Sequence, residues 1–547
     1  MRSAVLGARN LAGCEHRLAL DFSRADEAAA GESAEAGRRM EAAQEHRARV
    51  IEMLLGMQSS RPGTCVVVDD QRPHRERVAQ TLAACEAGAA WIFHAALPVD
   101  VEHGRRGHSE ILVRSGDGYV PVIIVNHRVT TPAKAARDPE VPPALLTSPL
   151  WGWLPAPDGR RTSRSNRRDA LRLTHLTAML RELGLSAAAD PDELLAGVIG
   201  SDADCIVALR IGPLLEEYDD TLARRRAIAD GRIETVPSKV SECRSCLWWP
   251  SCEADLTDRR DVSLVVGGSG LGVLQLHGID TVDQLAEFRG DPPEDWPNNT
   301  KFDDAVVIAN CWLRDVPLVR RLDRPRVRRA DVEVDVDMES FGERGAYMWG
   351  TLLTDNTDSS VPVIYRSFVT WDPLPTLDEG RSFGQFWTWL MDERGKAHAQ
   401  GKTFAAYCYS QQAENRWLRG SADRFSDQAA VPTRAEVDAF IDSDEWVDVY
   451  EAVTKNFICP KGKGLKVIAP IAGFGWRDDE AGGEASMDWY AAAVGLDGGP
   501  LDVSQRARLL EYNEDDVQAT KVLREWLSSE EILELPRARD LVPATAS

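Results

Sequence analysis

The most constraining feature of the chain is a run in which acidic and apolar residues alternate, DVEVDVDMES at residues 331–340. Side chains alternate between the two faces of a β-strand, so the run predicts a strand with its carboxylates on one face, each about 7 Å from the next. The five acids are Asp331, Glu333, Asp335, Asp337 and Glu339. Because like charges in a row repel one another, this face is expected either to meet water or to bind a cation.

The whole chain has the composition of a soluble globular protein with two or three domains. It contains 547 residues, of which 43% are hydrophobic and 28% are charged. A long apolar run and a secretion signal are both absent, so we expect a cytoplasmic location and no membrane span. The net charge of −23 disfavours non-specific adhesion to nucleic acid. It does not exclude a nuclease, because bound metals and local arginine clusters can offset the charge.

Three cysteines near the middle of the chain have the spacing of metal ligands. Cys243, Cys246 and Cys252 form the pattern C-x2-C-x5-C, and Trp248 and Trp249 lie between them. Thiolates this close in sequence can surround one soft metal centre, and the two indoles would shield it from water. The alternative is three ordinary buried cysteines.

The cysteine pattern, with Cys14 near the N-terminus and a strand-rich segment between, resembles the iron–sulfur RecB-like nucleases. These are PD-(D/E)xK enzymes with a restriction-endonuclease-like fold. The resemblance implies a domain over residues 1–257 in which Cys14, Cys243, Cys246 and Cys252 bind a [4Fe–4S] cluster, with Zn²⁺ as the alternative.

The catalytic pattern of that family is incomplete in this chain. Glu110 can serve as the first acid, but Ile123 and Val125 stand where the family has an acid and a lysine. The helix that carries Gln-x3-Tyr in the family has Arg172 and Leu176. We therefore expect a nuclease fold with a degenerate site, although residual cleavage through Glu110 is an open alternative.

A second resemblance joins the acidic strand to a late helix. The sequence EYNEDDVQAT places Tyr512 and Asp516 four residues apart and thus on one helical face, with Asp515 rotated toward water. An acidic strand followed by this Tyr-x3-Asp pair resembles the DEDD 3′–5′ exonucleases, which have an RNase H-like fold with a mixed sheet. The resemblance covers about residues 330–530 and implies an exonuclease domain over residues 330–547. It implies Asp337, Glu339 and Asp516 as ligands of two Mg²⁺ or Mn²⁺ ions, with Tyr512 orienting or deprotonating the attacking water.

The second acidic motif of the exonucleases is harder to identify. We expect Glu414, in a segment that runs from a strand into a helix, to be the fourth metal ligand; a surface glutamate is the alternative. Asp448 is expected to support the site from behind the ligands. Lys466 is a candidate phosphate contact or a plain surface lysine.

Residues 258–329 are expected to form a helical, helix-hairpin-helix-like connector and a basic linker between the two domains. Asp331 and Glu333 are expected to meet water beside this linker. Within the first domain, Arg160, Arg161 and Arg164 belong to a flexible arginine-rich stretch that either contacts a phosphate backbone or is solvated.

An α/β multidomain chain of this kind resembles the RecB-like nucleases that fuse the two folds. The expected function is a two-metal 3′–5′ exonuclease acting on DNA or RNA with a single-stranded 3′ end, in concert with a helicase or repair partner. The alternative is an inactive nucleic-acid-binding adaptor of DNA repair or RNA processing.

Overall fold

A computed structural model describes residues 3–29, 34–59, 65–133, 145–164, 166–480 and 482–542. The chain divides into two compact units, Met1–Ser263 and Leu264–Ser547. The predicted hairpin region therefore belongs to the second unit, while the three-domain division with limits at 257 and 329 stays a prediction. Within the described residues, every helix is too short or too polar to cross a lipid bilayer.

The first unit is built on an eight-stranded mixed sheet with the strand order β2-β3-β5-β6-β11-β12-β8-β9. Its strands are β2 (Cys65–Val67), β3 (Trp91–Ala96), β5 (His108–Ser115), β6 (Gly118–Ile124), β8 (Leu145–Ser148), β9 (Ala156–Asp158), β11 (Leu195–Ile199) and β12 (Ile206–Arg210). Strands β3, β5 and β6 form an antiparallel meander, and β11 runs parallel to β6. A hairpin turn at residues 115–118 joins β5 to β6, because β5 ends at Ser115 and pairs there with Gly118.

Helices cover both faces of this sheet. Helix α3 (Ala34–Ser59) packs Val50, Ile51 and Leu54 on one face. Helices α4 (His74–Glu86) and α5 (Arg167–Glu182) pack on the other face. The remaining elements are β1 (Leu6–Gly7), α1 (Glu15–Ser23), α2 (Ala25–Ala29), β4 (Arg105–Arg106), β7 (Thr130–Pro132), β10 (Arg161–Ser163), α6 (Leu215–Ala229) and α7 (Trp249–Asp258). The unit is a mixed α/β structure, and its assignment to the PD-(D/E)xK fold stays a prediction.

The second unit contains a five-stranded mixed sheet with the order β16-β15-β14-β17-β18. These strands are β14 (Val332–Phe341), β15 (Gly345–Asp355), β16 (Ile364–Val369), β17 (Phe404–Cys408) and β18 (Trp446–Asp448). The acidic run thus forms the central strand, antiparallel to β15 and parallel to β17. Parallel strands need a crossover, and helix α11 (Asp378–Ala399) lies in the connection from β16 to β17.

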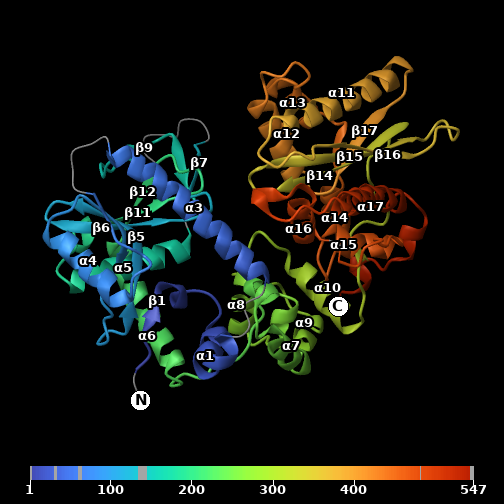
Figure 1. Ribbon diagram of the computed structural model, residues 1–547. Helices are drawn as coiled ribbons and strands as arrows, with labels where there is room; N and C mark the ends of the chain where they lie inside the picture. Colours follow the sequence, from blue (N-terminus) through green and yellow to red (C-terminus); the bar gives the residue numbers. More distant parts are fainter. Residues whose placement is uncertain are drawn as a thin grey trace. The chain divides into compact units, whose positions relative to one another are not determined.

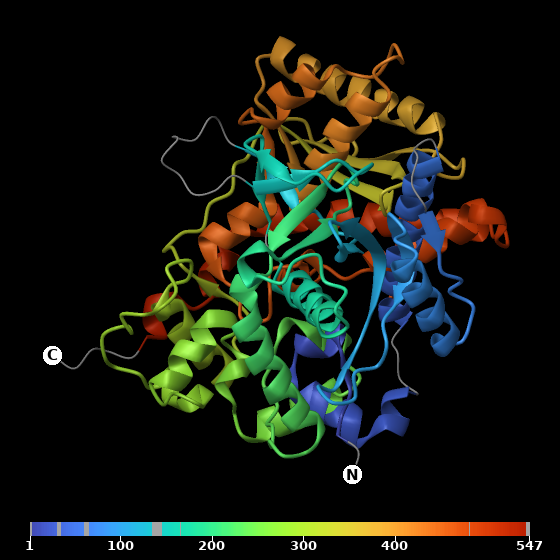
Figure 2. The ribbon, with the colours of Figure 1, turned by 90° about the vertical axis from the view of Figure 1, so that its left-hand side faces the viewer.

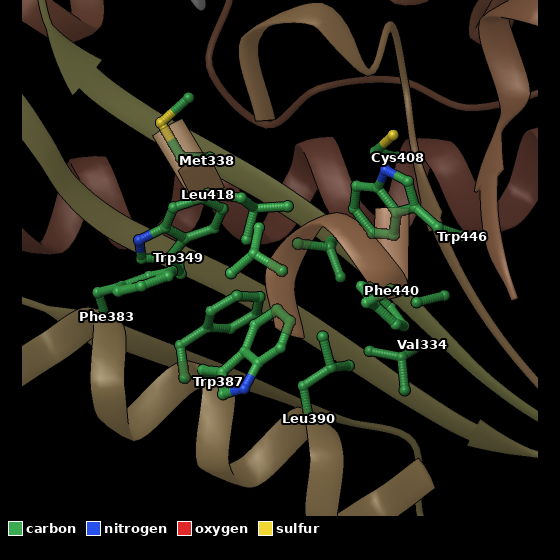
Figure 3. Close-up of a cluster of buried hydrophobic side chains, with 14 of the residues drawn as sticks. Val334, Met338, Trp349, Phe383, Trp387, Leu390, Cys408, Leu418, Phe440 and Trp446 are labelled. Atoms are coloured by element: carbon green, nitrogen blue, oxygen red, sulfur yellow. The ribbon is translucent and has the colours of Figure 1, made fainter. Parts of the chain in front are cut away.

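The apolar half of the alternation forms the main core of the second unit. Val332, Val334, Val336 and Met338 lie in one buried cluster with side chains of α11, α12 (Gln412–Arg424) and α13 (Arg434–Ile441). Figure 3 shows Val334 and Met338 beside aromatic rings such as Trp349, which stacks on Phe386 with 4.7 Å between ring centroids. Four residues of β14 are therefore buried on one face as the period of two predicts.

The opposite, acidic face of β14 is covered by helix α17 (Ser504–Trp526). Figures 1 and 2 show α11–α13 on one side of this sheet and α16 and α17 on the other. Helix α17 is continuous over its whole length, because no glycine or proline interrupts the sequence there. The remaining elements are α8 (Gly268–Leu276), α9 (Val282–Ala286), α10 (Phe302–Leu313), β13 (Val319–Arg320), α14 (Val449–Asn456), β19 (Phe457–Ile458), α15 (Leu465–Ile468) and α16 (Gly483–Val494).

Candidate functional site

Three carboxylates converge where α17 crosses β14. Asp337 and Glu339 on β14 and Asp516 on α17 each offer an oxygen, and these three oxygens lie within 4.8 Å of one another. Glu339 and Asp516 are buried, and Asp337 is half-buried. The spacing of the strand brings the first two acids to one face, and the helix supplies the third from 177 residues or more along the chain.

Burial and mutual repulsion make this group unfavourable as three free anions. Burial, and then the charge of Asp516, raise the pKa of Asp337 well above its ordinary range. Burial and the charges of Asp337 and Asp516 raise the pKa of Glu339 in the same way. Carboxylate oxygens are the ligands that hard divalent cations prefer, and a bound cation would relieve the repulsion among them. The three acids could therefore hold Mg²⁺ or Mn²⁺.

The other half of the acidic row is neutralised by arginine. Arg524 on α17 is fully buried and donates two hydrogen bonds of 2.8 Å to Asp335 and one to Glu333. Arg329, in the basic linker, donates two more to Glu333, at 2.7 and 2.9 Å. The expectation that Glu333 meets water is therefore wrong; it is buried with two guanidinium partners. Asp331 binds the backbone and hydroxyl of Thr403 at the exposed start of the strand.

Tyr512 and Lys466 lie beside the three acids. The Lys466 ammonium donates to the Tyr512 hydroxyl at 3.3 Å and lies 4.6 Å from the centre of its ring. Burial lowers the pKa of Lys466, and the charges of Asp516, Glu339 and Asp337 oppose that shift. Burial, then Glu339 and Asp516, raise the pKa of the Tyr512 phenol. The phenol therefore keeps its proton in the absence of a cation, which favours orienting a water over deprotonating it.

Asn513 is a site residue that the sequence analysis missed. Its amide nitrogen donates to Asp337 Oδ2 at 2.8 Å, and its amide oxygen accepts from the Tyr365 hydroxyl at 2.7 Å. Gly350 of β15 is the residue that pairs with Asp337 of β14. A Cβ atom on Gly350 would lie only 1.6 Å from the side-chain oxygen of Asn513. The spacing in the sequence could have identified Asn513, because it precedes Asp516 by one helical turn and therefore lies on the same face of the helix.

Aromatic and basic side chains of the segment before α16 hold α17 on its outer side. Trp476 Nε1 donates to Asp516 Oδ1 at 2.7 Å. Arg477 binds Asp515 through its backbone nitrogen at 2.9 Å and its guanidinium at 2.8 Å. Asp515, expected to be solvated, is buried, because Arg477 supplies a partner that no local pattern reveals.

Glu414 lies near the three acids but outside their group. It is 4% exposed in the first turn of α12, and its Oε2 atom has no hydrogen-bond partner among the described residues. Burial and then the charge of Asp337 raise its pKa well above the ordinary range. Asp448 accepts backbone hydrogen bonds from Ser410 and Gln411, so it fixes the turn that leads into α12. An unpartnered buried carboxylate beside Asp337 fits a fourth ligand of a cation.

The four predicted cluster ligands of the first unit surround one cavity. Cys14, Cys243, Cys246 and Cys252 all line it, together with Trp248 and Trp249. Burial, and then the charges of Cys246, Cys14 and Cys243, raise the pKa of Cys252 to about 11. Thiols that repel one another's ionisation in this way are close enough to share a metal centre once they are deprotonated.

Three of the remaining predicted residues of the first unit, Glu110, Arg160 and Arg161, form ion pairs. Both oxygens of Glu110 accept hydrogen bonds from Arg172, at 2.7 and 2.9 Å. Ile123 is buried in the core. Arg160 and Arg161 bind Asp158, and Arg161 also binds Asp204 at 2.7 Å. Arg164 is exposed.

Comparison with known proteins supports the predicted fold for one part of the chain. A family model described as the RNase H superfamily matches residues 406–528, a range that contains Glu414, Lys466, Tyr512 and Asp516 but begins after β14. The second unit therefore contains an RNase H-like domain, which indicates a nuclease-type role in nucleic-acid processing. No curated protein and no solved structure matches the chain significantly.

Two isosteric substitutions on β14 should change stability in opposite directions. Asp337→Asn removes one of three repelling charges, so we expect the metal-free protein to gain roughly 1 kcal/mol. Asp335→Asn breaks the buried pair with Arg524, so we expect a loss of about 3 kcal/mol or more. Urea unfolding in the presence of a chelator measures both changes.

The same two variants should separate in their response to metal. Added Mg²⁺ or Mn²⁺ should stabilise the parent and Asp335→Asn, by about 2.7 kcal/mol at a hundredfold excess over Kd, and should have little effect on Asp337→Asn. Equal metal stabilisation of all three proteins would show that the three acids do not bind the ion.

Gly350 should tolerate no side chain. Gly350→Ala would force the Asn513 amide away from Asp337, so we expect a loss of about 1–3 kcal/mol in stability and about a hundredfold in any activity of the site. Gly395→Ala, in open space on α11, is the matched control and should be neutral or stabilising. If both alanines behave alike, the close approach at Gly350 has no role.

Proposed function

We propose that the second unit is a metal-dependent nuclease, and specifically a 3′–5′ exonuclease that shortens DNA or RNA from a single-stranded 3′ end. The observation that supports this most is the convergence of Asp337, Glu339 and Asp516 within 4.8 Å in a domain of RNase H type. Tyr512 beside Asp516 favours the exonuclease among the nucleases of this fold class, through the resemblance to the DEDD enzymes.

The donor set suits two Mg²⁺ or Mn²⁺ ions. All four candidate ligands are carboxylates, and Glu414 has an oxygen without a partner among the described residues. When bound, the ions would supply Lewis-acid stabilisation of the attacking and leaving oxygens of a phosphodiester. The ligands would be Asp337, Glu339 and Asp516, with Glu414 joining the ion nearest Asp337.

The residues around the ligands have separate tasks. Asn513 donates a hydrogen bond to one oxygen of Asp337, so it would hold that carboxylate in place while the other oxygen could bind an ion. Trp476 donates in the same way to one oxygen of Asp516. The protonated Tyr512 phenol can orient a water or a phosphate oxygen, and the Lys466 ammonium beside it offers a positive charge to the phosphate.

Cleavage should depend on the three acids and on metal. With a labelled single-stranded oligonucleotide and Mg²⁺ or Mn²⁺, we expect stepwise shortening from the 3′ end and release of nucleoside monophosphates. Asp337→Ala and Asp516→Asn should each reduce the rate by on the order of a hundredfold or more. The readout is a sequencing gel of the labelled products.

Two controls distinguish this activity from its alternatives. Glu110→Ala should leave the rate unchanged, because Arg172 already neutralises that carboxylate. A rate that survives Asp337→Ala and falls with Glu110→Ala would place the cleavage in the first unit. Equal, negligible cleavage by the parent and Asp337→Ala would favour the non-catalytic adaptor.

We also propose that the cysteine cavity binds a [4Fe–4S] cluster. Four thiolates around one Zn²⁺ ion, with Zn–S bonds near 2.3 Å, would lie about 3.8 Å apart. Within the residues that the structure describes, no three of these sulfurs lie within 4.8 Å of one another. The wider spacing favours the larger cluster, which the two indoles would shield from solvent.

Purified protein should then be brown and contain about four irons per chain, with broad visible absorption that dithionite bleaches. Cys252→Ser should lose most of this iron and colour. Cys205→Ser should keep both, because Cys205 does not line the cavity. Stoichiometric zinc with no iron in the parent would favour the alternative metal.

A further inference from the structure

A second cavity of the first unit is rich in arginine. It is bordered by residues 8–13, helix α1, the start of α5 and α6. Five arginines line it: Arg9, Arg17, Arg168, Arg172 and Arg225. In a chain with a net charge of −23, such a concentration of guanidinium groups is a local exception.

The acids around this cavity already have partners. Asp21 pairs with Arg17 at 3.4 Å, and Asp169 with His127 at 2.8 Å. Glu242 pairs with Arg168. Behind the wall, Glu110 is held by both of its oxygens on Arg172. Each of the three acids that line the cavity is therefore paired with a basic side chain.

Cations remain once these pairs are formed. Arg225 donates to the backbone oxygens of Asn10, Ala12 and Gly13, which carry no net charge. Within the described part of the chain, Arg9 forms no ion pair with any acid. The wall therefore carries more positive than negative charge.

A third guanidinium without an acidic partner lies close to Arg9 and Arg172. Arg47, on α3, is half-buried and forms no ion pair within the described ranges. Burial and the charges of Arg172 and Arg9 lower its pKa, and Glu110 opposes the shift. Glu110 is already bound by Arg172, so an anion between Arg9, Arg47 and Arg172 would relieve the repulsion among these guanidinium groups.

We propose that this cavity binds a phosphate group without cutting it. Planar guanidinium groups match phosphate oxygens with paired hydrogen bonds, and Arg9 has its donors available for such a contact. Because Arg172 occupies both oxygens of Glu110, the acid that a nuclease would use for metal is bound to a cation instead.

The expected source of the phosphate is a nucleic-acid strand, and this choice rests on the proposed function. A free nucleotide or inorganic phosphate shares the same chemistry. The phosphate site itself does not depend on whether the second unit cleaves, so binding is measured in full-length Asp337→Asn, which should hold the strand without shortening it.

The test compares Arg9→Ala with Arg75→Ala, an equal loss of charge on an exposed residue of α4 outside the cavity. Fluorescence anisotropy of a labelled single strand, at several salt concentrations, gives the affinity and its salt dependence. We expect Arg9→Ala to weaken binding about tenfold. Arg9→Ala should also reduce the slope of log K against log salt concentration by about 1. Arg75→Ala should change neither the affinity nor this slope. Arg9→Lys should recover part of the affinity, since lysine restores the charge but lacks the paired donors of a planar guanidinium group.

A parallel arm titrates ATP and inorganic phosphate and follows the melting temperature. Stabilisation that Arg9→Ala removes, with strand binding unaffected, would confirm the phosphate site and identify a free nucleotide as its source. If neither strand, ATP nor phosphate distinguishes Arg9→Ala from Arg75→Ala, the proposal is wrong. Arg47→Ala, tested in the same way, guards against misfolding of the first variant. Retained cleavage in Arg9→Ala with Asp337 intact separates this site from the proposed exonuclease.

Discussion

The buried guanidinium of Arg524 between Glu333 and Asp335 fixes helix α17 on the acidic face of β14. Removing such a charge from water is costly unless its partners meet it with good geometry, so the contact permits little sliding of the helix. Eight residues of helix from Arg524 to Asp516 span about 12 Å. Four residues of strand, from the middle of the Glu333–Asp335 pair to the middle of the Asp337–Glu339 pair, span about 13 Å. A helix anchored at one pair therefore delivers Asp516 to the other.

The buried carboxylates of the protein lie in two kinds of electrostatic environment. Glu333 and Asp335, like Glu110 in the first unit, are matched by arginine and become structural. Asp337, Glu339 and Asp516 have only Lys466 nearby as a cation among the described side chains, and one ammonium does not balance three acids. Their remaining negative charge is what makes the site suitable for a divalent ion.

Sequence patterns predicted the local parts of this arrangement. Period-two alternation gave the strand and its two faces, and the four-residue spacing of Tyr512 and Asp516 gave a shared helical face. The same patterns failed where a partner is distant. Glu333 was expected in water because Arg524 lies 191 residues away.

The same limit applies to Asp515 and Asn513. Their partners, Arg477 and Asp337, are 38 and 176 residues distant. Spacing can identify which residues share a face, but the identity of the group that meets that face depends on tertiary packing. The RNase H-like domain was predictable for a related reason, since its signal lies in the order of short motifs along the chain.

The separation of Asp337 from Asn513 also has a consequence during synthesis. The central strand leaves the ribosome 176 residues before the helix that completes the site. Until that helix docks, the carboxylates of β14 face solvent, where they ionise freely and lack Asp516. A nascent domain therefore cannot bring the three acids together before α17 has been synthesised.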